Sequence, residues 1–125
     1  MRLASPLSTA LALAILVAPA GPAAAVDAPF QPHLLRLSEV LGALHFLRNL
    51  CGERGETWRE QMQRLIEAEE PLPELRSRYV ASFNRGYRSY EGTYTTCTAS
   101  ATEAIARFMK EGEALSRDIA VKFGN

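Results

Sequence analysis

The chain has 125 residues, and its 14 lysines and arginines balance its 14 aspartates and glutamates. This length is enough for one domain of ordinary size and for no more. Neutral charge argues against a nucleic-acid-binding protein, which needs a basic surface to displace counterions, and against strong attraction to anionic lipid.

Residues 1–25 have the composition of a secretory signal peptide. Arg2 gives a positive start, residues 7–18 are an almost unbroken apolar run, and the segment ends in three alanines. We therefore predict export to the periplasm with cleavage near Ala25. A membrane anchor is the alternative, but the apolar run is shorter than the roughly 20 residues that cross a bilayer. The mature chain, residues 26–125, is predicted to be a single helical domain with no stable membrane anchor.

The first predicted helix covers residues 33–50. Its apolar residues recur at steps of three and four, which defines one stripe of a helix. The stripe consists of Leu34, Leu37, Val40, Leu41, Leu44, Leu47 and Cys51. Because Leu35, Phe46 and Leu50 widen the stripe, we predict that this helix is central and is covered on more than one side.

A second helix is predicted over residues 57–69, and Pro71 stops it. Its first turn contains the pattern of a capping box, in which the side chains of Thr57 and Glu60 each bind an unpaired backbone N–H. Its inward-facing residues are expected to be Trp58, Met62, Leu65 and Ile66.

The third and fourth helices are predicted over residues 73–90 and 99–122. The apolar stripe of the third consists of Leu75, Tyr79, Val80, Phe83, Tyr87 and Tyr90, and Gly86 beside it either permits close approach of a neighbouring helix or is simply tolerated. The fourth opens with a second capping pattern, Ser100 and Glu103. Its inner face is expected to contain Ala101, Ile105, Phe108, Met109, Leu115 and Ile119. Four helices with short links predict an all-α fold, a small four-helix bundle.

The chain has two cysteines, Cys51 and Cys97. Cys51 ends the first predicted helix and Cys97 precedes the fourth, so a bond between them would staple the bundle. Two thiols of a small domain in an oxidising compartment usually form a disulfide. A redox-active or metal-binding pair is the alternative, but there is no C-x-x-C and the histidines, His33 and His45, lack ligand spacing. We predict a structural disulfide, no metal and no cofactor.

A candidate binding surface follows from the tyrosines, which all lie between residues 79 and 94 and alternate with arginines. Aromatic rings and guanidinium groups together bind carbohydrates or anionic groups. We predict such a surface at the end of the third helix and in the following loop, formed by Arg85, Arg88, Tyr90 and Tyr94. The competing interpretation is a solvated face, in which the two arginines pair with Glu91 or with the acidic cluster at residues 67–70.

The sequence favours binding over catalysis, because no nucleophile with its base is recognisable. His45 borders the apolar stripe, where a core histidine is more common than a catalyst. Glu67, Glu69 and Glu70 lie at a helix end, where arginines of the third helix can pair with them. We predict a non-enzymatic periplasmic module that binds an envelope protein or glycan. The alternatives are a small envelope hydrolase that uses carboxylates and a structural component that acts by self-association.

Several blocks of the sequence resemble a known family. They include LGALHFLRNLCG at residues 41–52, WREQM at 58–62, LIEAE at 65–69, FNRGYRSY at 83–90 and TYTTCT at 93–98. These blocks are similar to those of DUF2385, a family of small exported alphaproteobacterial proteins, over about residues 34–124. The resemblance implies bacterial export and the pairing of Cys51 with Cys97. It implies no catalytic residue and no established activity.

Overall fold

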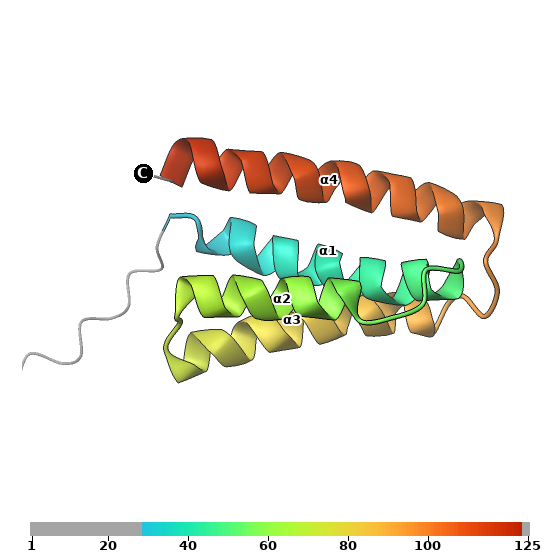
Figure 1. Cartoon of the computed structure of the whole chain (residues 1–125), viewed down its shortest axis with the longest axis horizontal. Helices are drawn as coiled ribbons and strands as arrows, with labels where there is room; N and C mark the ends of the chain where they lie inside the picture. The colour runs from blue at the N-terminus through green and yellow to red at the C-terminus, as the bar shows by residue number, and fades with distance from the viewer. Residues whose placement is uncertain (1–28, 124–125) are drawn as a thin grey trace, which may run out of the picture.

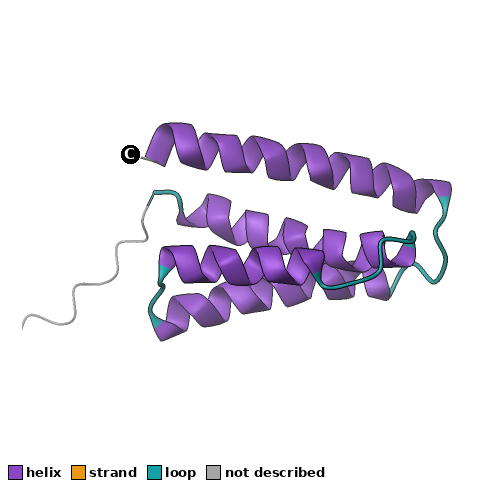
Figure 2. Ribbon diagram, in the orientation of Figure 1, coloured by secondary structure: helices purple, strands orange, loops and turns teal. Residues whose placement is uncertain are grey.

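The computed structural model describes residues 29–123, and the predicted signal peptide lies outside them. The described chain forms four helices joined by short connections (Figures 1 and 2): α1 over Gln31–Leu50, α2 over Thr57–Glu69, α3 over Pro73–Glu91 and α4 over Ala99–Phe123. The predicted all-α fold is confirmed, and the predicted helix boundaries agree closely with the observed ones. Between residues 29 and 123, no helix has both the length and the apolar character needed to cross a bilayer.

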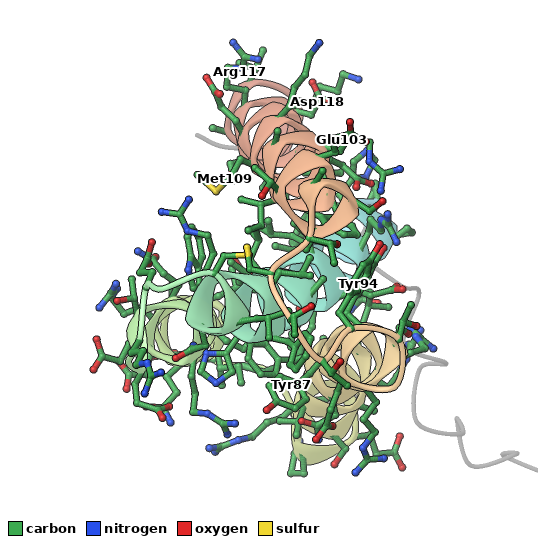
Figure 3. All side chains as sticks on the ribbon, turned by 90° about the vertical axis from the view of Figure 1, so that its right-hand side faces the viewer. Tyr87, Tyr94, Glu103, Met109, Arg117 and Asp118 are labelled. Atoms are coloured by element: carbon green, nitrogen blue, oxygen red, sulfur yellow. A yellow bond between two sulfur atoms is a disulfide. The ribbon has the colours of Figure 1, made fainter. Side chains whose placement is uncertain are left out.

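α1 is the central helix, as the width of its apolar stripe predicted. Figure 3, which looks along the helices, shows α2, α3 and α4 on three different sides of it. Residues 40–45 of α1 are buried all round the helix. Within the described residues, the backbone of α4 comes close to α1 alone, whereas α2 and α3 approach both α1 and each other. The fourth helix is therefore attached to the domain along one side only.

α1 and α3 cross at two glycines. A Cβ atom at Gly42 would lie 1.8 Å from the backbone oxygen of Phe83, and a Cβ atom at Gly86 would lie 2.0 Å from the backbone oxygen of Glu39. Two helices can approach this closely only where neither carries a side chain. Of the two roles that the sequence allows for Gly86, the structure therefore supports close approach of a neighbouring helix.

The core consists of two clusters. One lies between α1 and α4 and contains Val40, Ala43, Leu44, Leu47, Ala101, Ala104, Ile105 and Phe108. The other joins α1 to α2 and α3 and contains Leu34, Leu41, Met62, Tyr79 and Phe83. Two residues that were expected to face inward are exposed, Val80 at 42% and Met109 at 40%. Each follows a buried residue by one position, about 100° round its helix, and lies beyond the narrow stripe that these outer helices bury.

Both predicted capping boxes are wrong. Thr57 is the first residue of α2, and no side chain caps this helix. The loop before α2 is held by Asn49, whose Oδ1 accepts the Gly55 N–H at 2.8 Å and whose Nδ2 donates to the Gly55 carbonyl at 3.0 Å. At α4, Thr98 takes the capping role in place of Ser100, because its Oγ1 accepts the Ala101 N–H at 3.1 Å. Each predicted cap therefore lies inside the helix that it was expected to begin.

The predicted disulfide between Cys51 and Cys97 is present, and its Cα atoms lie 5.0 Å apart. It joins the residue after α1 to the loop that precedes α4. Because α4 has no close backbone neighbour besides α1 in the described chain, this bond fixes the end at which α4 begins. The remainder of α4 is held by the side chains that it buries against α1.

Removal of the disulfide is expected to destabilise the protein. The two cysteines are separated by 46 residues, and in the chain-entropy model a loop of that length contributes about 4 kcal/mol to stability. The Cys51→Ser/Cys97→Ser variant should lose about 2–5 kcal/mol in urea unfolding followed by circular dichroism. An unchanged free energy of unfolding, or two free thiols in the mass spectrum of the unreduced wild type, contradicts this expectation.

Substitution of Gly86 by alanine should also destabilise the protein, although alanine is the better helix former by about 1 kcal/mol. The added methyl group would overlap the α1 backbone at Glu39, and overpacking of this kind costs about 1–3 kcal/mol or more. Gly112→Ala in α4 is the matched control, since the nearest atom to its new Cβ is Val40 Cγ1 at 3.4 Å. Thermal unfolding should show a loss for Gly86→Ala and none for Gly112→Ala; equal effects would argue against the close crossing.

Candidate functional site

A pocket lies beside the predicted binding surface, between α1, α3 and α4. Its volume is about 350 Å³, and it is lined by Arg36, Glu39, Ala43, Gly86, Ser89, Tyr90, Thr93 and Phe108. We refer to it as the Tyr90 pocket. It remains open because the backbones of α3 and α4 do not approach each other. Two of its residues, Ala43 and Gly86, belong to the close crossing of α1 and α3, so the walls rest on a rigid part of the fold.

Aromatic rings form one wall of the Tyr90 pocket. The rings of Tyr90 and Tyr94 are stacked, with centroids 6.1 Å apart and planes inclined by 7°. Phe108 of α4 meets Tyr90 edge-on at a centroid distance of 5.3 Å. Figure 3 shows Tyr94 on the opposite side of α1 from α2. Two of the four predicted surface residues, Tyr90 and Tyr94, are thus in contact with each other, and Tyr90 lines the pocket.

A chain of ion pairs borders the same pocket and connects three helices. Arg36 of α1 donates to both carboxylate oxygens of Glu111 on α4, at 2.7 and 2.9 Å. Glu39 of α1 lies 3.4 Å from Arg36 and 3.7 Å from Arg85 of α3. Hydrogen bonding to Glu111 raises the pKa of Arg36, against the lowering effect of its burial. Arg85 is therefore paired, with Glu39 in place of the acidic partners that the sequence suggested.

Of the four predicted surface residues, Tyr90 alone lines the pocket, and Arg88 forms no ion pair or ring contact with the other three. Arg88 is exposed and has no ion pair within the described chain. At 100° per residue it lies 200° from Gly86, on the face of α3 that points away from α1. Three lining residues of the pocket were not predicted to belong to a binding site, namely Arg36, Glu39 and Phe108. These residues come from two other helices, and no spacing in the sequence shows that they meet.

His45 has a structural position. It is 7% exposed, and its ring lies 5.8 Å from the ring of Phe83 and 5.6 Å from that of Tyr87. Burial lowers the pKa of His45 below its usual 6.5, and the charge of Arg59 adds to this effect. Both causes favour the neutral imidazole. Since His45 does not line the Tyr90 pocket, the position agrees with the core histidine expected from the sequence.

The acidic cluster lies elsewhere, at the turn between α2 and α3. Glu67 and Glu70 line a pocket of about 380 Å³ together with Arg76 of α3. Glu70 has a φ angle of 43° and ends α2 in the left-handed conformation. The fold thus places an arginine of α3 beside these carboxylates. Among residues 29–123, no three histidine, cysteine, aspartate or glutamate side chains are grouped so that they could hold a metal ion.

The buried neutral His45 predicts a pH dependence of stability. Its folded-state pKa lies below its unfolded value, so the unfolded chain binds the proton first as the pH falls through about 6.5. The free energy of unfolding should therefore decrease between pH 7 and pH 5. His45→Gln should flatten this decrease in urea titrations at several pH values. Identical pH profiles for the variant and the wild type would exclude His45 as the cause.

The comparisons with known proteins agree with the sequence blocks described above. The profile of a family described as "Protein of unknown function (DUF2385)" matches residues 29–123, which is the whole of the described domain. No curated protein and no solved structure matches the chain significantly. The family description assigns no activity, so a proposal about function has to start from the geometry of the domain.

Proposed function

This chain belongs to the DUF2385 family, and we propose that it is a non-enzymatic periplasmic module that binds an envelope partner at the Tyr90 pocket. The observation that carries the proposal is the meeting of stacked tyrosines with an ionic wall in one open pocket. Pockets with a few fixed polar groups among apolar walls are typical of ligand sites. The signal-peptide pattern at residues 1–25 and the disulfide support the periplasmic location, because disulfides persist in oxidising compartments.

The Tyr90 pocket offers both apolar and polar contacts to a ligand. Ser89 donates its hydroxyl to the Arg85 carbonyl at 2.7 Å, and Thr93 donates to the Ser89 carbonyl at 3.0 Å. Each hydroxyl oxygen therefore keeps acceptor positions for a donor on the ligand. The rings of Tyr90 and Phe108 supply an apolar surface beside these oxygens. A protein side chain or a sugar unit that has donors and an apolar face fits this combination.

The arrangement favours binding over catalysis. Glu111 of α4 is bound by Arg36 of α1, and Glu39 of α1 pairs with Arg85 of α3, so both carboxylates hold helices together. The buried His45 lies on another part of α1, and two aromatic rings of α3 pack against it. General acid–base catalysis requires a group that reaches the substrate and exchanges a proton with it. The described groups of the pocket wall are instead arranged as fixed hydrogen-bonding partners.

A bulky side chain at Ser89 tests the site, because Ser89 is exposed and lines the pocket. The bait is the disulfide-bonded protein recovered from the periplasm, which should begin near Val26. We expect Ser89→Trp to lose the partner that the wild type captures from an envelope extract. Arg88→Trp is the matched control, since Arg88 lies about 100° from Ser89 on α3, on the face that points away from α1, and this variant should retain the partner.

Parallel sedimentation with isolated cell-wall sacculi separates a glycan partner from a protein partner. If the wild type and Arg88→Trp sediment with the sacculi and Ser89→Trp does not, the ligand of the pocket is a glycan. If both variants capture the same partners as the wild type, and all three have the same melting temperature, the Tyr90 pocket is not the binding site. Recovery of further copies of the chain alone would favour the structural, self-associating alternative.

A further inference from the structure

A second groove lies on the other side of α4, between α4 and α2. A depression of about 570 Å³ is continuous with one of about 310 Å³, because they share Leu37, Leu41, Gln61 and Ser116. We refer to both together as the α2–α4 groove. Figure 3 shows Met109 on this side of α4 and Tyr94 on the other side. The groove exists because α2 and α4 both pack on α1 and their backbones do not approach each other.

The α2–α4 groove is apolar along its floor and walls. Its apolar lining consists of Leu37, Val40, Leu41 and Leu44 of α1, Trp58 and Leu65 of α2, and Phe108 and Met109 of α4. Met109 is 40% exposed, and Gly112 beside it adds no side chain. Contiguous exposed apolar surface marks interaction sites. Methionine is common at binding surfaces, because its flexible side chain can adjust to the shape of a partner.

Two positive charges border the groove without partners. Arg64 of α2 and Lys110 of α4 both line it, and neither has an ion pair within residues 29–123. One negative charge, Glu113, also lines the groove, and it lies 4.0 Å from Arg117. In a chain whose total charge is zero, the two uncompensated cations select an occupant with carboxylates along its flanks.

The length of the floor fits a short helix. Leu37 and Leu44 are seven residues apart on α1, which corresponds to about 10 Å along the helix axis. This is two helical turns, the distance spanned by anchor residues i, i+3, i+4 and i+7 of an amphipathic helix in a hydrophobic groove. The groove is open along its side, as lateral docking of a helix requires.

We propose that the α2–α4 groove binds an amphipathic helix of a partner protein, with the apolar face on α1 and acidic residues beside Arg64 and Lys110. Apolar burial supplies the contact, and the two cations select the charge and orientation of the helix. The groove lies on the opposite side of α4 from the Tyr90 pocket. This inference therefore stands independently of the proposed function, and the two have separate variants.

The single tryptophan of the chain, Trp58, lines the groove, so its fluorescence reports occupation directly. The probes are two synthetic helical peptides with the same leucine stripe, one flanked by glutamates and the other by lysines. The glutamate peptide should shift the emission of Trp58 saturably and should bind about tenfold more tightly than the lysine peptide. The Arg64→Glu/Lys110→Glu variant should reverse this preference.

Arg88→Glu/Arg107→Glu is the matched control. It makes the same change in net charge outside the groove, since Arg107 lies 200° from Met109 on α4. The control should keep the wild-type preference, and circular dichroism verifies that both variants are folded. The proposal is overturned by equal binding of the two peptides, by no shift with either, or by an unchanged preference in Arg64→Glu/Lys110→Glu.

Two other occupants are distinguished in the same assay. If vesicles of phosphatidylglycerol shift the Trp58 emission and the glutamate peptide does not, the groove takes lipid and the proposal is wrong. If the emission shifts with protein concentration alone, and light scattering shows a dimer that the peptide does not dissociate, a second copy occupies the groove. That result also overturns the proposal.

Discussion

The close contact of α1 and α3 at Gly42 and Gly86 determines how the remaining elements are arranged. With no side chain between them, the two backbones meet directly, and Phe83 is buried at the crossing. α2 then packs beside both helices and buries Met62 in the same cluster. Another face of α1 remains for α4, and the disulfide at Cys51 fixes the start of α4 against it. Because α4 gains no second close neighbour among the described helices, an open depression remains on each of its sides.

The two sides of α4 differ in chemistry because different residues border its buried stripe. On the side of α3, Glu111 binds Arg36, and the resulting wall is ionic. On the side of α2, Met109 and Gly112 border the stripe, and the leucines of α1 form an apolar floor. One helix thus separates a polar, aromatic pocket from an apolar groove. The two proposed sites therefore differ in chemistry.

The spacing of apolar residues was sufficient to predict the four helices, because a helix that buries one stripe repeats its apolar residues at a fixed period. The disulfide was predictable because the two cysteines lie at helix ends. The hydrogen bonds before α2 and α4 were not predictable from such patterns, since they come from Asn49 and Thr98 instead of the expected capping boxes. The contact between Tyr90 and Tyr94 could be anticipated, because the two residues are only four positions apart in the sequence. Arg36 and Phe108 were missed, because their proximity depends on how α1 and α4 pack. The exposure of Met109 follows from the same missing neighbour of α4.

We expect α1 and α3 to form the most stable part of the domain, because α4 is attached to it along one side only. Native-state hydrogen exchange measures this directly, since it reports the free energy of opening at each backbone amide. Backbone amides around Gly42 and Gly86 are expected to exchange only when the whole domain unfolds. Amides of α4 beyond Phe108 should exchange through a local opening of lower free energy. Equal protection of α1 and α4 along their whole lengths would show that α4 is not the less stable part of the domain.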